Sequence, residues 1–326
     1  MSKLLEVKNL SVDYITLNGA VRAVDDVSFS IEEEQSMGLA GESGCGKSTI
    51  AYSLMRLHRP PALIADGSIE LAGRDIIKMK EEELRQFRWE QISMVFQSAM
   101  NCLNPVVKLD RQFYEIYKNH GITQNRHEAR AKAEELIEIV GIPRDRLGDY
   151  PHQFSGGMRQ RAVIAMALAL KPKLLIMDEP TTALDTVVQR EILQRVYELK
   201  KELKFSILFI THDLSLMMEF CDDVSIMYAG KIVEQAPSQT ILNHPQHPYS
   251  YGLKNSFPSL HGDIEYMEGI PGSPLNMSKI PPGCRFQDRC FRAQDICFKE
   301  VPPRKHMGND FYDCHNPMGT LTGSKN

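Results

Sequence analysis

The chain has 326 residues, of which 42% are hydrophobic and 25% are charged, and its formal net charge is −4. This length allows more than one compact unit, the composition is ordinary, and the acidic balance gives no support to a broad nucleic-acid-binding surface. Residues 163–170 form a long apolar run for this chain, yet they fall far below the ~20 residues that cross a bilayer. The first eleven residues lack a hydrophobic signal segment. We therefore expect a cytosolic protein that reaches a membrane only through a partner.

The N-terminal region is expected to be rich in strands. Residues 4–12 and 21–31 have the pattern of two strands, and Tyr14 lies between them. An aromatic side chain near a phosphate-binding loop can stack on a nucleotide base, but an ordinary strand residue also explains Tyr14. Both interpretations stay open from this pattern alone.

A glycine-rich loop follows a short apolar strand at residues 37–40. It contains Gly41, Gly46, Lys47 and Ser48 in the spacing G-x-x-x-x-G-K-S, which is the P-loop pattern. Such a loop points backbone N–H groups at phosphate oxygens, and the helix expected at about residues 48–57 adds the positive end of its dipole. The residues that we expect to contact nucleotide here are Gly41, Ser43, Gly44, Cys45, Gly46, Lys47, Ser48 and Thr49.

The middle of the chain alternates between strand and helix patterns. Residues 68–71 and 92–96 have strand patterns, and the second of these ends at Gln97. Residues 78–90 predict a charged, solvated helix, and residues 110–140 have helical periodicity.

A second helix start follows at Ser155-Gly156-Gly157. Ser155 is a natural N-cap, and the helix is expected to run through to residue 171, before Pro172. Its N-terminus is a second site that favours an anion.

Two more buried strands are expected to end in polar residues. Residues 173–178 predict a strand that ends at Asp178 and is followed by Glu179. In a P-loop protein this is the Walker B element, whose aspartate holds magnesium. Asp185 and a helix at residues 187–203 come next. Residues 206–210 then predict a strand before His212, and residues 224–228 and 231–234 predict a hairpin.

Beyond residue 234 the chain becomes rich in proline and glycine, and it is too poor in core residues to fold firmly without a staple. Four of the seven cysteines lie here, at Cys284, Cys290, Cys297 and Cys314. Their clustering in a cytosolic chain favours metal binding over disulfides. The spacing differs from the C-x2-C pairs of common zinc sites, and four thiolates suit zinc or an iron–sulfur cluster.

Taken in order, these motifs resemble the ATP-binding subunits of ABC transporters. The P-loop, Gln97, Ser155-Gly156-Gly157, Asp178-Glu179, Asp185 and His212 occur in family order. The region beyond residue 240 resembles the oligopeptide/dipeptide importer branch, on the evidence of residues 247–249, Leu253, Pro258, residues 282–286 and residues 289–290. Met158 departs from the broad family's glutamine, and residues 97–105 lack the Asp-Pro that often follows Gln97.

The resemblance implies an α/β P-loop NTPase core with an antiparallel β subdomain and a helical subdomain at about residues 98–165. Residues 1–240 form the nucleotide-binding domain, and residues 241–326 form a small irregular cysteine-rich C-terminal domain.

The same resemblance implies a set of roles in ATP hydrolysis. Tyr14 stacks on adenine, and Lys47 contacts the β- and γ-phosphates. Ser48, Gln97 and Asp178 arrange Mg²⁺, Glu179 is the general base, and His212 contacts the γ-phosphate. Ser155, Gly156 and Gly157 complete the site of a second cassette.

The resemblance also implies the partners and the location. The partners are a second ATPase subunit, identical or different, a membrane permease and an extracytoplasmic solute-binding protein, at the cytoplasmic face of the plasma membrane. The four C-terminal cysteines hold a [4Fe–4S] cluster, with zinc, free thiols and disulfides as alternatives. Peptides are the expected cargo, while oligosaccharides and, less favoured, nickel stay open. A non-transport ABC ATPase and a small-molecule P-loop kinase are the rival functions.

Overall fold

A computed structural model describes residues 2–97, 102–180, 185–256 and 269–319. Residues 98–101 of the variant stretch 97–105, residues 181–184 before Asp185, and Pro258 lie outside these ranges. The chain divides into two compact units. Unit 1 comprises Met1–Leu5, Ser30–Gln35 and Glu70–Phe209, and unit 2 comprises Glu6–Phe29, Ser36–Ile69 and Ile210–Asn326.

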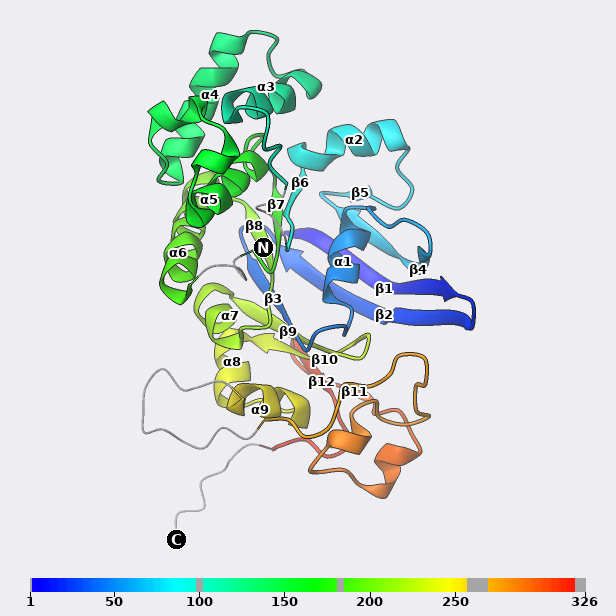
Figure 1. Cartoon of the computed structure of the whole chain (residues 1–326). Coiled ribbons are helices and arrows are strands. Elements are labelled where there is room, and N and C mark those ends of the chain that lie inside the picture. The colour runs from blue at the N-terminus through cyan, green and yellow to red at the C-terminus, as the bar shows by residue number, and fades with distance from the viewer. Residues whose placement is uncertain (1, 98–101, 181–184, 257–268, 320–326) are drawn as a thin grey trace. The chain divides into compact units, whose positions relative to one another are not determined.

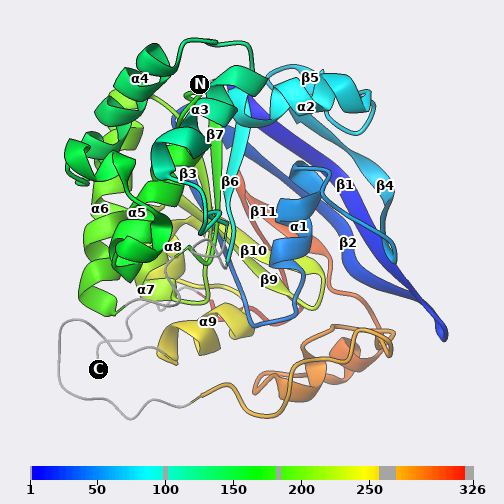
Figure 2. The ribbon, with the colours of Figure 1, turned by 45° about the horizontal axis from the view of Figure 1, so that its top comes forward.

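Unit 2 combines strands from the two ends of the sequence. Most of β1, β2 and β4 belongs to it, with neighbours in the order β2-β1-β4, and a second group has the order β11-β12-β10-β9-β3. Helix α1 lies beside β1 and β2 in both views (Figures 1 and 2). The elements of unit 2 are β1 (Lys3–Thr16), β2 (Gly19–Glu32), β3 (Ser36–Ala40), α1 (Lys47–Leu54), β4 (Ala62–Leu71), α7 (Leu214–Phe220), β9 (Asp223–Tyr228), β10 (Lys231–Pro237), α8 (Ser238–Asn243), α9 (Pro248–Asn255), β11 (Arg304–Met307) and β12 (Asp310–Asp313).

Strand β3 is the buried strand that leads into the P-loop. All five of its residues are buried, as expected for a parallel strand covered on both faces, and it pairs in parallel with β9. The hairpin between β9 and β10 is confirmed, with Ala229 and Gly230 both at positive φ in its turn. Strand β12 pairs with β10 through Glu234 and Gln235. The proline-rich C-terminal region therefore adds strands next to β10, which its faded periodicity did not predict.

Unit 1 contains neighbouring strands in the order β8-β7-β6, with β6 and β7 parallel. Helices α3 to α6, drawn in green, gather together (Figures 1 and 2). The elements of unit 1 are β5 (Arg74–Asp75), α2 (Glu81–Glu90, broken at Arg88 and Trp89), β6 (Ile92–Val95), α3 (Leu109–Asn119), α4 (Arg126–Ile139), α5 (Gly156–Ala167), β7 (Leu174–Asp178), α6 (Thr186–Leu203) and β8 (Ser206–Ile210).

Two helix predictions need correction. The continuous helical pattern at residues 110–140 forms two helices, because Gly121 takes a positive φ after α3 and Asn125 caps α4 by accepting a hydrogen bond from the His127 N–H. The helix after Ser155 ends at Ala167 instead of residue 171, and Lys171 has a left-handed φ of 52°. Proline disfavours the helical conformation in the residue before it, so the chain leaves the helix ahead of Pro172.

Candidate functional site

The P-loop connects β3 to α1 and exposes the start of that helix without a side-chain cap. The N-cap residue of α1 is Gly46, and no side chain hydrogen-bonds there. The first N–H groups of a helix have no partner inside the helix, and such a helix start favours an anion. Lys47 is 5% exposed, and its Nζ donates to the carbonyl oxygens of Gly41 (2.7 Å) and Glu42 (2.9 Å).

Close backbone packing requires glycine at two P-loop positions. A Cβ on Gly41 would lie 2.2 Å from the carbonyl oxygen of Met227, and one on Gly46 would lie 2.6 Å from that of Ala23. Both residues also have positive φ, at 151° and 111°, where side chains with a Cβ are disfavoured. The loop is therefore pressed against the backbone of β2 and β9.

The remaining predicted residues of unit 2 lie on or near this loop and at the end of β8. The Tyr14 hydroxyl is 3.4 Å from Oγ1 of Thr49. Burial raises the pKa of the Cys45 thiol, whereas Lys47 lowers it. His212 is exposed and lies between β8 and α7. Ser43 and Gly44 are exposed, and Ser48 is half-buried at the start of α1.

In unit 1 the end of β7 presents two carboxylates. Asp178 is 1% exposed, and Glu179 follows it with a left-handed φ of 45°. Such a conformation is strained for a residue other than glycine and is typical of functional positions. Gln97 Nε2 donates to Glu179 Oε2 at 2.7 Å. The structure thus brings together two predicted residues that are 82 positions apart in the sequence.

Helix α5 begins at the predicted Ser155-Gly156-Gly157 motif. Ser155 is its N-cap, and its Oγ accepts a hydrogen bond from the Met158 N–H at 3.3 Å. A Cβ on Gly157 would lie 3.2 Å from Val188 in α6, so a small residue here allows close helix packing. Asp185 caps α6 by accepting from the Val188 N–H at 3.0 Å.

The four C-terminal thiols influence one another electrostatically. Burial raises the pKa of Cys284 to about 11, and the nearby thiols of Cys297 and Cys290 add to this rise. Burial also raises the pKa of Cys314 to about 12, again with a contribution from the other three thiols. The pKa of Cys290 is raised by burial and by Cys297. Cys284, Cys290 and Cys314 therefore favour the protonated form unless a cation displaces the protons.

Within residues 2–97, 102–180, 185–256 and 269–319, no group of three or more His, Cys, Asp or Glu side chains has the arrangement of a metal site. The thiols thus match a metal or cluster in ligand chemistry, but in the described residues they are not gathered into a ligand shell. In the same ranges, no helix is both long enough and apolar enough to cross a membrane.

Sequence reasoning missed Glu42, which lies within the P-loop, and two residues that contact it, Arg289 and Tyr249. Glu42 occupies a variable position of the motif, and its carboxylate pairs with Arg289. Its N–H donates to the Tyr249 hydroxyl oxygen at 2.9 Å. Residues 247–249 and 289–290 are recognisable from the sequence only as motifs of the importer branch, and a sequence motif does not identify a partner 247 positions away.

Comparison with known proteins identifies the family. Residues 24–182 match the model of the ABC transporter family, and residues 233–297 match the C-terminal region of oligopeptide/dipeptide transporters. A peptide import ATP-binding protein of Brucella abortus (strain 2308) is 46% identical over 301 residues, covering 92% of this chain and 90% of the relative. The chain belongs to the ABC transporter ATP-binding proteins. It lies in their oligopeptide/dipeptide branch, as expected, and is an ATPase of the P-loop fold.

Other members of the family agree with this placement. The oligopeptide transport ATP-binding protein OppD of Escherichia coli (strain K12) is 43% identical to this ABC protein, over 98% of this chain and 94% of OppD. A dimeric structure of the ATP-binding cassette MJ0796, in a post-hydrolysis state bound to ADP and Pi, is 25% identical. It matches with a TM-score of 0.65 and covers 72% of this chain and 98% of MJ0796.

Proposed function

We propose that this ABC ATPase powers the uptake of oligopeptides or dipeptides through a membrane permease. The match of residues 233–297 to the C-terminal region of peptide transporters carries this proposal. The peptide names of the relatives support it, and they favour peptides over the oligosaccharide alternative.

The P-loop residues are proposed to hold the triphosphate. The start of α1, which has no side-chain cap, is proposed to face phosphate oxygens. Lys47, which the Gly41 and Glu42 carbonyls hold at the loop, is proposed to contact the β- and γ-phosphates. Tyr14 supplies an aromatic face for adenine. Positioning and charge stabilisation supply most of the catalysis in this class of reaction.

Glu179 is proposed as the general base for the attacking water. Ser48, Asp178 and Gln97 are proposed to hold Mg²⁺, which offsets the charge of the phosphates when bound. The hydrogen bond from Gln97 to Glu179 supports the role of Glu179 as the base, because it orients a carboxylate oxygen of Glu179 at the end of β7. His212 is proposed to contact the γ-phosphate from the end of β8.

The signature residues Ser155, Gly156 and Gly157 are proposed to complete the ATP site of a second cassette, and Asp185 to lie in the loop beside that interface. The dimeric MJ0796 structure supports the pairing of cassettes. We propose further that the pair docks on a permease at the cytoplasmic face of the membrane and receives peptides through a solute-binding protein. Motion is relayed through the Gln97 loop and the helices of unit 1.

We also propose that Cys284, Cys290, Cys297 and Cys314 hold a structural [4Fe–4S] cluster, with zinc as the alternative. Their residue type and their grouping between residues 284 and 314 support this proposal, and binding of the cluster would release the protons of the thiols. Anaerobic purification followed by iron, sulfide and zinc analysis tests this. About four iron and four sulfide per chain are expected, whereas iron-free protein contradicts the cluster.

Transport is tested in the source organism by replacing the chain with its Glu179→Gln variant. Uptake of labelled dipeptides and oligopeptides is expected to fall to the level of a deletion strain, while uptake of labelled oligosaccharides is unchanged. Loss of oligosaccharide uptake with normal peptide uptake would reverse the assignment. Stimulation of the ATPase by ribosomes or DNA, with no permease association, would instead indicate a non-transport role.

A further inference from the structure

The segment from Cys284 to Cys290 contains two arginines. Arg289 contacts the P-loop, and Arg285 contacts the turn at Ala229 and Gly230. Arg289 makes a two-pronged ion pair with Glu42, with Nη1 to Oε2 at 2.6 Å and Nη2 to Oε1 at 2.8 Å. The Arg289 side chain is 6% exposed, and its Nε donates to the carbonyl oxygen of Pro271 at 2.8 Å. Paired, planar contacts of this kind fix geometry as well as charge. Arg289 therefore holds one carboxylate in one orientation.

Glu42 is restrained at its side chain, its N–H and its carbonyl. Its N–H donates to the Tyr249 hydroxyl oxygen. Its carbonyl accepts from Lys47 Nζ at 2.9 Å and from the Cys45 N–H at 3.3 Å. Any shift of Glu42 therefore moves the group against which the phosphate-binding lysine rests.

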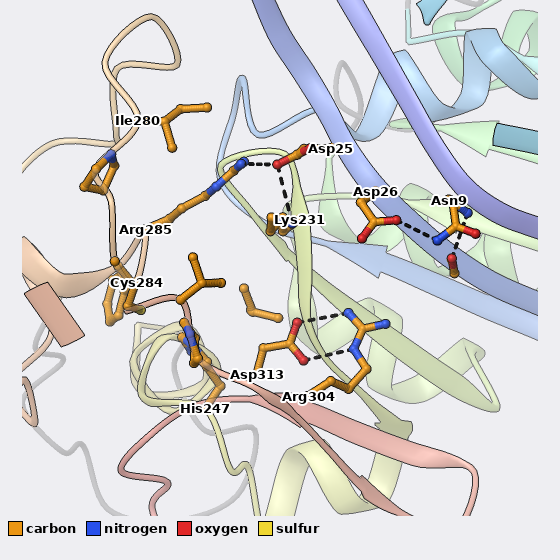
Figure 3. A pocket seen from close by; sticks show the side chains of 17 residues that line it. Asn9, Asp25, Asp26, Lys231, His247, Ile280, Cys284, Arg285, Arg304 and Asp313 are labelled. Carbon is orange, nitrogen blue, oxygen red and sulfur yellow. Dashed lines mark hydrogen bonds and ion pairs between the residues drawn. The ribbon is translucent and has the colours of Figure 1, made fainter. Parts of the chain in front are cut away.

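Arg285 acts on the P-loop indirectly, through the turn between β9 and β10. It donates to the carbonyl oxygen of Ala229 and pairs with the carboxylate of Asp25, which also contacts Lys231 (Figure 3). The adjoining Gly230 N–H donates to the carbonyl oxygen of Cys45 at 2.9 Å, inside the P-loop. Arg289 thus contacts the P-loop directly, whereas Arg285 contacts the turn at Ala229 and Gly230 that hydrogen-bonds to it.

Three aromatic rings form a rigid base for these contacts. The ring centroids of Tyr228 and Tyr249 are 4.7 Å apart, and that of Phe286 is 5.1 Å from Tyr228 and 5.2 Å from Tyr249. The Arg289 guanidinium lies 5.9 Å from the ring centroids of both Tyr228 and Phe286. Such packing restricts the rotamers of Arg289 and Tyr249, so their contacts to Glu42 are held before any nucleotide arrives.

We propose that the segment 284–290 and Tyr249 of α9 together form a clamp on the P-loop. Arg289 and Tyr249 are its positioning residues, and they hold Glu42, and through it Lys47, ready for the phosphates of ATP. A loop that is ordered in advance loses less entropy when it binds its ligand. The clamp acts on nucleotide affinity and not on the chemical step. It rests on the ATPase function of the chain and is independent of the cargo.

Matched variants separate this role from a merely structural one. Arg289→Ala removes the pair to Glu42. Arg304→Ala is the control, because Arg304 makes a similar two-pronged pair with Asp313, at 2.9 Å for both contacts, yet touches no P-loop residue in any described contact. Affinity is measured on the full chain with a fluorescent ATP analogue and Mg²⁺, and thermal unfolding is followed without nucleotide.

Arg289→Ala is expected to raise the Kd for the analogue by roughly ten-fold or more through lost preorganisation, and to raise KM while kcat changes little. Arg304→Ala is expected to lower the melting temperature without changing the Kd. Tyr249→Phe, which removes one hydrogen bond, is expected to raise the Kd by about three- to ten-fold. Arg289→Lys keeps the charge but loses the second contact, so its Kd is expected to lie between those of wild type and alanine.

Coupling provides a second readout. If Arg289 acts through Glu42, the effects of Arg289→Ala and Glu42→Gln on the Kd are less than additive in the double variant. The proposal is wrong if folded Arg289→Ala binds the analogue as Arg304→Ala does. Should Arg289→Ala fail to fold, the other two variants decide the matter. The proposal is then wrong if Arg289→Lys and Tyr249→Phe both bind the ATP analogue with wild-type affinity. A failed peptide-uptake test leaves these affinities unaffected, so the two proposals fail separately.

Discussion

Helices α1 and α5 both begin at glycine-rich motifs, but their starts are held in different ways. Gly46 at the start of α1 has no side-chain cap, and the loop before it is held by distant residues such as Arg289 and Tyr249. Ser155 at the start of α5 instead caps its own helix through the Met158 N–H. The P-loop therefore takes part of its shape from residues far away in the chain, whereas the start of α5 is capped by its own N-cap residue.

The same contrast extends to the acidic end of β7 in unit 1. Glu179 is oriented by one hydrogen bond from Gln97, in a strained left-handed conformation. The P-loop of unit 2 is restrained by several contacts from remote residues, whereas the orientation of Glu179 in unit 1 is set by a hydrogen bond from Gln97. Variants in unit 2 are expected to change ATP affinity and the stability of the fold. Variants in unit 1 are expected to change the turnover of ATP.

The largest effect is expected from Glu179→Gln, which keeps the shape of the side chain but removes its basicity. Loss of a general base lowers turnover by roughly 10²- to 10⁴-fold, and ATP affinity is expected to stay within about two-fold of wild type because binding depends on the P-loop. Phosphate release and nucleotide titration measure the two quantities. Wild-type turnover in this variant would rule out Glu179 as the base.

An intermediate effect is expected from the buried histidine that starts α9. Complete burial lowers the pKa of His247 from an ordinary value near 6.5 to about 3, and its Nδ1 accepts from the Tyr249 N–H. Between about pH 3 and pH 6.5, His247 therefore binds a proton in the unfolded chain but not in the folded chain. The contribution of His247 to the free energy of unfolding does not change with pH above about pH 6.5. It falls as the pH drops from there toward about 3, by up to about 1.4 kcal/mol per pH unit.

His247→Asn tests this, because asparagine keeps an N-cap acceptor without a titrating ring. Between about pH 6.5 and pH 5, the wild type is expected to lose about 2 kcal/mol more unfolding free energy than the variant in urea denaturation. Burial raises the pKa of Glu234, whose carboxylate accepts from the His247 N–H. This carboxyl is present in both proteins, so it cancels in the comparison. Equal pH slopes for the two proteins would contradict the prediction.

The smallest effect is expected from the cap of α5. Ser155→Ala leaves the Met158 N–H without its acceptor and is expected to cost about 1 kcal/mol of unfolding free energy. Asn125→Ala is the matched control, since Asn125 caps α4 by accepting from the His127 N–H at 2.9 Å. Both variants are expected to lose similar stability, but only Ser155→Ala is expected to lower ATPase activity. Equal activity in the two variants would argue against a role for Ser155 in the ATP site.

Much of the ATP-binding region could be predicted because its signals are contiguous. The P-loop spacing, the fully buried strands β3 and β7, and the hairpin at Ala229 and Gly230 each depend on neighbouring residues. Helix ends were less predictable. The periodicity of residues 110–140 continues across Gly121, so the break between α3 and α4 was not visible in the apolar pattern.

The sequence by itself determined which loop can bind phosphate, which carboxylates follow a buried strand, and which family the chain resembles, because these depend on short spacings of particular residue types. Only the tertiary structure decided what holds that loop in place. The contact between Glu42 and Arg289 spans 247 positions, and the pairing of β12 with β10 joins Glu234 to Tyr312, also far apart in the sequence. No local pattern encodes such contacts, because they form only when folding brings the two segments together.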